Sequence, residues 1–257
     1  MLQAGKLPGL QSILDAGGVF CDIETINKTV TVPTWTLMFT SLDSSQTGVT
    51  TNRNTRQKIP IEDIITNPIR NSGYLIGWFV AKDFLWNNSP LKKIMSNVDA
   101  GGLFTAVDNA GACLDNSVTD INQRAVQFIM DNRGKDFFLF VHIGPDCYGH
   151  GHGENSERYL YEFVRSDEVV QNILAVIDFD TRIMVVNDHG FDEGASDHQS
   201  APDLWMVTDL LIKEIYHNGE TRGTVRDIPL TIWDFFGVYG WRDNPSKYRG
   251  KSMLIIE

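Results

Sequence analysis

The sequence is poor in cysteine, and the few cysteines it has do not form a recognisable pattern. Its three cysteines are Cys21, Cys113 and Cys147, an odd number at wide spacing. A disulfide framework or a structural zinc knot needs closer and more regular spacing. We therefore expect neither, and the pattern favours a reducing compartment. Cys147 lies inside a motif loop, where we interpret it as a bystander.

Basic clusters and long apolar runs are also missing. The chain has 22 Lys and Arg against 33 Asp and Glu, a net charge of −11, and no basic block. Binding to the phosphate backbone of a nucleic-acid duplex needs clustered Lys and Arg side chains, so the sequence argues against a nucleic-acid duplex as a partner. No apolar run reaches membrane-spanning length. The first thirty residues show no signal peptide. As written, the chain shows no membrane segment and reads as cytoplasmic, but its localisation is left open, because a signal peptide could have been lost with a missing N-terminal segment.

The apolar residues that are present are enough for a packed core. Of 257 residues, 42% are hydrophobic and 11% aromatic, and this length fits one large domain or two small ones. Segments with strand character alternate with segments of helical periodicity, an order typical of a sheet covered by helices. The helices are expected at Leu7–Ala16, from about Thr31, and at Ser117–Asn132, Ser156–Ile177 and Ile228–Val238. The strands are expected at Val19–Ile26, Ile59–Ile65, Gly73–Val80, Phe137–Ile143, Arg182–Val186 and Leu204–Val207.

This order predicts one domain over residues 1–257. Its fold class is α/β, a three-layer α/β/α arrangement with a mainly parallel central sheet. Residues 42–112 are polar and rich in turns, and we expect them to form a loop-rich cap that decides specificity.

The histidines gather in one part of the chain. Five of the six lie between Val141 and His198. Asp146 and His150 follow one apolar strand, Asp188 and His189 follow the next, and His198 comes shortly after. Sites in such folds gather at the carboxyl ends of the strands, so both clusters are expected at one edge of the sheet. Carboxylates and neutral imidazoles suit borderline divalent ions, which predicts a metal site, with room for two ions.

A run of hydroxyl residues begins the helix near position 31. Thr31 and Thr34 flank Pro33 there, and proline is tolerated in the first turn of a helix. A hydroxyl at this place caps the helix in most proteins. The same place also faces the positive end of the helix dipole, which favours a phosphate group. Both readings remain open at this level.

The motifs together resemble the alkaline phosphatase superfamily, above all its type I phosphodiesterase/nucleotide pyrophosphatase and phosphomutase-like branches. The segment from Pro145 to Tyr159 resembles the P-D-x-x-G-H-x-x-G-x-x-S-x-x-Y signature, Asp188 to Gly190 resembles the D-H-G motif, and Asp197-His198 has phosphomutase-like spacing. Each motif alone is short, but their order and spacing cover nearly the whole chain.

The resemblance implies roles for these residues. Asp146, His150 and His198 would hold one divalent ion, and Asp188, His189 and the Thr31 hydroxyl the other, with zinc ahead of manganese. Thr31 would be the nucleophile for a small phosphorylated substrate. Thr34 stands where diesterase relatives often carry a phosphate-contacting asparagine, and is the candidate substrate-binding residue.

One expected element is missing from the sequence. Relatives carry their first metal-binding aspartate at the end of a strand that precedes the first helix. Here the helix at Leu7–Ala16 comes almost at once, and neither Asp15 nor Asp22 stands in the equivalent place. We therefore expect an N-terminally truncated domain without its first strand.

These observations favour a two-metal phosphoric ester hydrolase, with diesters or nucleotides ahead of monoesters. A phosphomutase-like or phosphonate-cleaving enzyme of the same superfamily is an alternative. A catalytically impaired binding domain is another, because of the missing aspartate. The substrate, the metal and the oligomeric state are left open.

Overall fold

A computed structural model gives the fold of residues 1, 4–26, 29–53, 59–80, 105–106, 117–198, 203–210, 212, 216–217, 220–221 and 223–255. The helices are α1 (Pro8–Asp15), α2 (Thr31–Thr40), α3 (Ser44–Thr47), α4 (Thr66–Asn71), α7 (Ser117–Asp131), α8 (Asp146–His152), α9 (Glu157–Leu174) and α10 (Asp227–Phe235), with short 3-10 turns η2 (Ile61–Asp63) and η3 (Gly240–Asp243). The strands are β1 (Val19–Glu24), β2 (Leu75–Val80), β3 (Thr105–Ala106), β4 (Phe137–His142), β5 (Met184–Val186), β6 (Asp203–Thr208), β7 (Tyr216–His217), β8 (Glu220–Thr221) and β9 (Gly223–Thr224).

The predicted α/β class is confirmed, but the sheet is mixed rather than mainly parallel. One sheet has the order β3-β2-β4, with both of its pairings parallel. The other has the order β5-β6-β1-β9, in which β6 runs antiparallel to both of its neighbours and β1 is parallel to β9. A separate two-stranded ladder joins β7 and β8. Alternation of strands and helices along a chain predicts a sheet without fixing each strand's direction, so the sequence alone could not reveal these antiparallel pairs.

Most of the expected elements form where the apolar spacing places them. The helix α1 begins with Pro8 in its first turn and stops before Gly17, whose φ of +95° suits glycine. The helix α9 is capped by Ser156, whose hydroxyl accepts the Tyr159 backbone N–H. The strand expected at Ile59–Ile65 is wrong, because this segment holds the 3-10 turn η2. Its apolar residues Ile59, Ile64 and Ile65 are buried, but they belong to a turn and its flanks and not to a strand.

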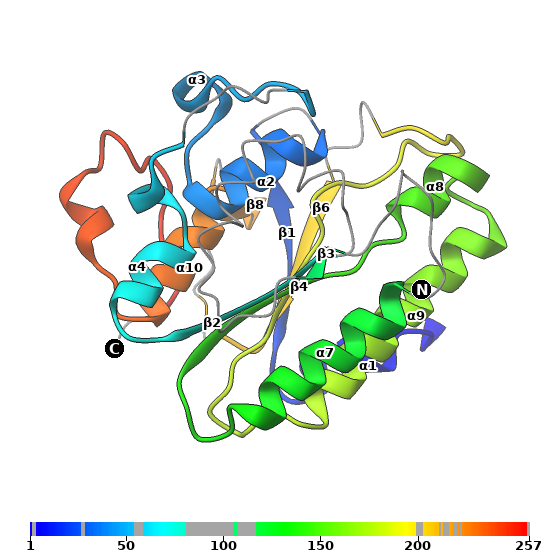
Figure 1. The fold of residues 1–257 in the computed structure, drawn as a ribbon. Helices are drawn as coiled ribbons and strands as arrows, with labels where there is room; N and C mark the ends of the chain where they lie inside the picture. The colour runs from blue at the N-terminus through cyan, green and yellow to red at the C-terminus, as the bar shows by residue number, and fades with distance from the viewer. Residues whose placement is uncertain are drawn as a thin grey trace.

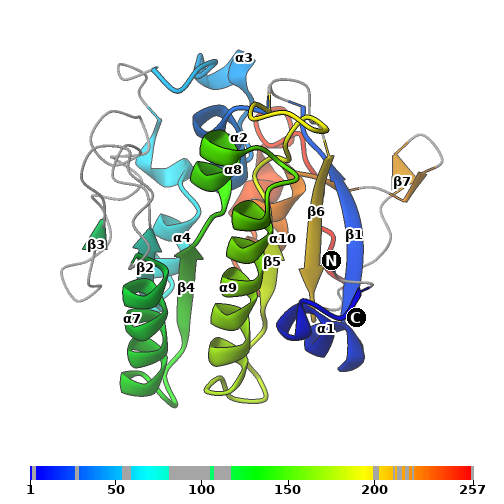
Figure 2. The same ribbon diagram turned by 90° about the vertical axis from the view of Figure 1, so that its right-hand side faces the viewer.

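Helices cover the strands on two sides (Figure 1). In Figures 1 and 2, α1, α7 and α9 lie on one side, while α2, α4 and α10 lie on the other. The largest core packs the aromatic residues of α2 and α10 against β2 and β4. A second core joins α1 and α9 to β6 through Leu10, Val170 and Val207. These packed layers fix the strand ends from which the site is built.

The region from 42 to 112 is described only in part. Its described residues include α3, α4 and β2, and the remainder of the expected cap lies outside the described residues. Its role in specificity and the single-domain organisation therefore stay predictions. Among the helices that the structure describes, none combines the length and the apolar character needed to cross a bilayer.

The cysteines differ from expectation. Cys147 is disulfide-bonded, whereas Cys21 is a reduced thiol. The expectation that no cysteine is paired is therefore wrong at Cys147. Spacing along the chain could not reveal this bond, because a disulfide depends on proximity in the fold.

Candidate metal centre

The site lies where β4 and β5 end. The strand β4 ends at His142, and α8 begins at Asp146 with His150 one turn later. The strand β5 ends at Val186, just before Asp188 and His189. The structure brings both clusters together at this edge, since Asp146 Oδ1 is 3.7 Å from His189 Nε2.

Asp146 is the centre of the cluster. Its Oδ1 atom lies 3.4 Å from His150 Nε2 and 3.7 Å from His198 Nε2. One ligand atom from each of Asp146, His150 and His198 falls within 4.8 Å of the other two. The side chain of His150 is 45% exposed, whereas that of His198 is 10% exposed. The group is therefore held on one side by the protein and open on the other.

The three imidazoles are oriented alike by backbone carbonyls. His150 Nδ1 lies 2.9 Å from the Ser196 carbonyl oxygen, and His198 Nδ1 lies 2.7 Å from that of Thr29. His189 Nδ1 lies 3.2 Å from the Gly190 carbonyl oxygen. A carbonyl only accepts, so this network places a proton on each Nδ1, and in the neutral ring the lone pair of each Nε2 then faces Asp146. Metal-binding histidines are oriented in this way.

A second group adjoins the first. Asp188 Oδ2 lies 3.6 Å from His189 Nε2 and accepts the Trp35 indole N–H at 2.8 Å. Thr31 Oγ1 lies 3.4 Å from the same His189 nitrogen. The three residues assigned to the second ion therefore lie next to one another, and His189 connects them to Asp146.

Thr31 stands at the start of α2 but does not cap it. The N-cap residue is Val30, and the helix has no side-chain cap. The Val32 N–H donates to Asn52 Oδ1 at 2.9 Å, and the Thr34 N–H donates to the Val30 carbonyl oxygen. Of the two readings of this segment, the structure disfavours capping by Thr31. The Thr31 hydroxyl faces the histidines instead.

Thr34 lies further along the same helix and is fully buried, with 0% exposure. Its side chain is closed to solvent in this structure, and a contact between Thr34 and substrate stays a prediction.

Aromatic packing holds the histidine rings in place. The rings of His189 and His198 stack with centroids 3.8 Å apart and an interplanar angle of 15°. Phe191 contacts His150 and His198 edge-on, with centroids 5.2 Å and 5.4 Å away. A Cβ atom on Gly149 would lie 2.4 Å from the Phe191 ring, so the glycine in this motif makes room for that ring.

Trp35 and Phe191 were missed by sequence reasoning. Trp35 follows Thr31 by about one helical turn, which could have placed its indole on the same side of α2. Phe191 directly follows the Asp188–Gly190 motif, but its contact with Gly149 depends on the packing of α8 and leaves no local signal.

Burial affects the protonation of His198 and Tyr159. It lowers the pKa of His198, and the adjacent His189 lowers that pKa further. Burial and the nearby carboxylate of Asp146 raise the pKa of the Tyr159 phenol. His198 is therefore kept neutral to lower pH than an exposed histidine, which is the form that binds a metal.

The residues fit a divalent ion. In a tetrahedral zinc site with bonds of about 2.0–2.1 Å, ligand atoms lie roughly 3.3–3.4 Å apart. The Asp146–His150 and Asp146–His198 distances of 3.4 Å and 3.7 Å are close to that spacing. Two imidazoles and a carboxylate with one open side are also the ligand types of catalytic zinc sites.

The fold matches solved structures of the alkaline phosphatase superfamily. A Bacteroides thetaiotaomicron structure from work on glycosaminoglycan metabolism aligns over 96% of this chain and 68% of its own, with a TM-score of 0.60 and 13% identity. The C-terminal periplasmic domain of EcEptC from Escherichia coli, in complex with Zn, aligns over 98% and 81%, with a TM-score of 0.59 and 10% identity. A 2-O GAG sulfatase aligns over 91% and 67%, with a TM-score of 0.53 and 12% identity. At these identities the likeness shows the fold alone.

The family follows from the sequence match. A model of the type I phosphodiesterase / nucleotide pyrophosphatase family matches residues 1–217, and the chain belongs to that family. No curated protein matches it. Family membership makes the chain a phosphoester hydrolase, which confirms the expected enzyme class at that level.

Proposed function

We propose that this protein hydrolyses small phosphoric diesters, nucleotides among them, through Thr31 and with two divalent metal ions. Asp146, His150 and His198 would hold one ion, and Asp188, His189 and Thr31 the other. The proposal rests on the contact of 3.4 Å between Thr31 Oγ1 and His189 Nε2. Through this contact a hydroxyl lies beside the imidazoles and carboxylates of both groups.

When bound, the ions would lower the pKa of the Thr31 hydroxyl and offset the charge on the phosphoryl oxygens. Zinc suits the imidazole and carboxylate ligands best, and manganese is the alternative.

Thr31 would carry out the covalent chemistry. Its Oγ1 loses the hydroxyl proton to solvent and forms a bond to phosphorus. The bond from phosphorus to the leaving oxygen breaks, and its electron pair departs with the alcohol or nucleotide product. Water then attacks the phosphothreonine, the bond between phosphorus and Oγ1 breaks, and Thr31 is restored.

The start of α2 would assist through its dipole. Pro33 has no N–H, and those of Val32 and Thr34 already donate within the protein. The positive field at the helix start would stabilise an anion by about 0.3–1 kcal/mol.

Hydrolysis of chromogenic esters tests the proposal. The apoprotein is assayed on a bis-nitrophenyl phosphodiester, a nitrophenyl phosphate and a nitrophenyl sulfate, with added zinc or manganese. We expect the diester to be the best of the three substrates and Thr31→Ala to reduce kcat by roughly 10³-fold or more. Thr36→Ala is the matched control, because Thr36 is buried on the same helix and its hydroxyl donates to the Val32 carbonyl.

Two results would contradict the proposal. Turnover retained in Thr31→Ala would show that Thr31 is not the nucleophile. Sulfate hydrolysis that exceeds diester hydrolysis would change the substrate class. Calorimetric titration with zinc counts the ions: we expect two per chain, and one tightly held ion without turnover would instead indicate a binding domain.

A further inference from the structure

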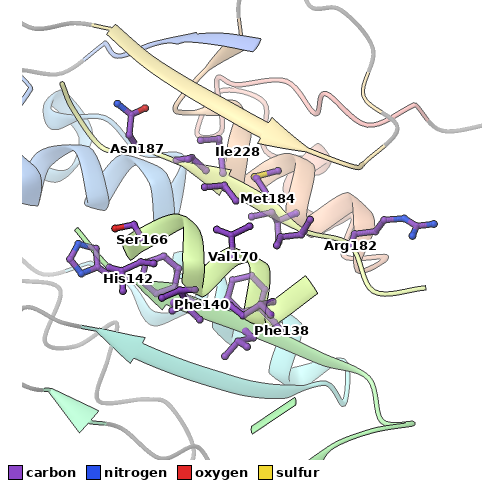
Figure 3. Close-up of a pocket in the computed structure, with 18 of the residues that line it drawn as sticks. Phe138, Phe140, His142, Ser166, Val170, Arg182, Met184, Asn187 and Ile228 are labelled. Atoms are coloured by element: carbon purple, nitrogen blue, oxygen red, sulfur yellow. The ribbon is translucent and has the colours of Figure 1, made fainter. Parts of the chain in front are cut away.

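The two strands that lead to the metal centre belong to different sheets, and a cavity of about 780 Å³ lies between them. Figure 3 shows His142, the last residue of β4, on one wall and Asn187, which follows β5, on the other. Beyond the strand ends the two ligand-bearing segments meet again. There the loop of residues 191–197 is hydrogen-bonded to the end of α8.

The loop of residues 191–197 connects ligands of both proposed ions. It begins two residues after His189 and ends directly before His198. The backbone N–H of Asp192 donates to the Asp197 carbonyl oxygen at 2.9 Å. This bond closes the loop and gives it a defined shape between the two histidines.

Glu154 holds the loop on α8 through two hydrogen bonds. It follows Gly153, the C-cap residue of α8. Its backbone N–H donates to the Ala195 carbonyl oxygen at 2.9 Å, and its Oε2 atom accepts the Gly194 N–H at 3.1 Å. Gly194 has a φ of +69°, which favours glycine. A bond from a backbone N–H to a carboxylate is charge-assisted and therefore stronger than one between neutral groups.

The residue that follows these two contacts in the loop orients a metal ligand. The Ser196 carbonyl oxygen lies 2.9 Å from His150 Nδ1, and the opposite ring nitrogen, Nε2, lies 3.4 Å from Asp146 Oδ1. The place of the Ser196 carbonyl depends on the chain at Gly194 and Ala195, to which Glu154 is bonded. The partner of a ligand's second ring nitrogen affects how strongly that ligand binds a metal.

We propose that Glu154 is a positioning residue of the metal centre. It fixes the loop of residues 191–197 on α8, so that the Ser196 carbonyl directs His150 at the ion. This inference rests on the metal ligands of the proposed function and does not depend on hydrolysis. A purely electrostatic role, in which the carboxylate attracts the cation, requires the charge of Glu154 but not its hydrogen bond.

Three substitutions separate the hydrogen bond from the charge. Glu154→Gln keeps an oxygen that accepts the Gly194 N–H but removes the charge. Glu154→Asp keeps the charge but is one methylene too short for that bond, and Glu154→Ala removes both. Calorimetric titration of each apoprotein with zinc measures the result. We expect Glu154→Ala and Glu154→Asp to bind zinc about three- to tenfold more weakly, as the loss of one hydrogen bond implies, and Glu154→Gln to stay within about twofold of the wild type.

Glu157→Ala is the matched control, because it removes an exposed carboxylate from the first turn of α9. It should leave zinc affinity unchanged.

The imidazole of His150 gives a second readout. Its Nδ1–H proton in the zinc-loaded protein is followed by NMR. We expect this resonance to shift and to exchange faster with water in Glu154→Ala and Glu154→Asp, and to keep its wild-type position in Glu154→Gln.

The outcomes are distinct. Wild-type zinc affinity in both Glu154→Ala and Glu154→Asp would overturn the proposal. So would a Glu154→Gln protein that binds zinc as weakly as Glu154→Ala, because the charge would then be what matters. If Glu154→Ala does not fold, the comparison of Glu154→Asp with Glu154→Gln decides. A wild type that binds no zinc would overturn the metal centre together with this role, whereas equal binding and turnover in all variants would overturn only the role of Glu154.

Discussion

Trp35 gives the sharpest test of the second metal group. Its indole N–H donates to Asp188 Oδ2 at 2.8 Å, and Trp35 itself is 2% exposed. Trp35→Phe keeps an aromatic ring in the core but removes this donor. Asp188 would then lose the bond that directs its carboxylate toward His189.

The size of the effect follows from the type of bond. A buried hydrogen bond to a charged group contributes about 1.5–3 kcal/mol, and loss of such a partner of a metal ligand weakens metal binding by about 10- to 100-fold. We expect that loss for the ion held by Asp188, measured by calorimetric titration of the apoprotein with zinc. Binding to Asp146, His150 and His198 should change less.

Trp233 provides the matched control. It is also 2% exposed, belongs to the same core as Trp35, and donates its N–H to the Ile65 carbonyl at 3.0 Å, away from the metal cluster. Trp233→Phe should lower the free energy of unfolding in urea by about 0.5–1.5 kcal/mol without changing zinc affinity. If Trp35→Phe binds both ions as the wild type does, or if both variants lose zinc affinity equally, the role given to Asp188 is refuted.

Three further predictions test the surroundings of the site. Gly149→Ala should displace Phe191 and lower zinc affinity and activity at least tenfold, whereas Gly151→Ala on the same helix, where a Cβ meets nothing within 4 Å, should change neither; equal losses in both would contradict the packing argument. Burial lowers the pKa of His198 below its usual 6.5, so below that pH the unfolded chain of the apoprotein takes up a proton that the folded chain does not. The free energy of unfolding should therefore fall from pH 7.5 to 5.5, and urea titrations of His198→Gln should show a smaller fall. Burial and then Asp22 raise the pKa of the Cys21 thiol to about 11, so iodoacetamide at pH 8 should label it roughly a hundredfold more slowly than in urea; equal rates, measured by mass spectrometry, would refute this.

Local sequence patterns were enough to predict the elements that carry the site. The run Phe137–Ile143 is apolar throughout and the segment from Ser156 has helical spacing, and both signals depend only on neighbouring residues. Strand pairing depends on contacts between distant segments. The antiparallel placement of β6 between β1 and β5 therefore left no sign in the order of elements.

The same limit applies to the site. Asp146 and His189 could be expected to lie at one edge because each follows a strand, and they lie 3.7 Å apart. The carbonyl partners of the imidazoles could not be predicted, since Thr29 and Ser196 belong to loops whose paths depend on the whole fold. The Cys147 disulfide was missed for a similar reason.

The backbone anchoring of the histidines has a consequence for the evolution of the enzyme. Every amino acid carries a main-chain carbonyl, so the positions that orient His150 and His198 impose no side-chain identity. Ser196, which is exposed, can change during divergence while its main chain continues to hold His150. Exposed residues around the site can therefore be replaced, and substrate selectivity can change, while the main chain keeps the histidines in the same orientation.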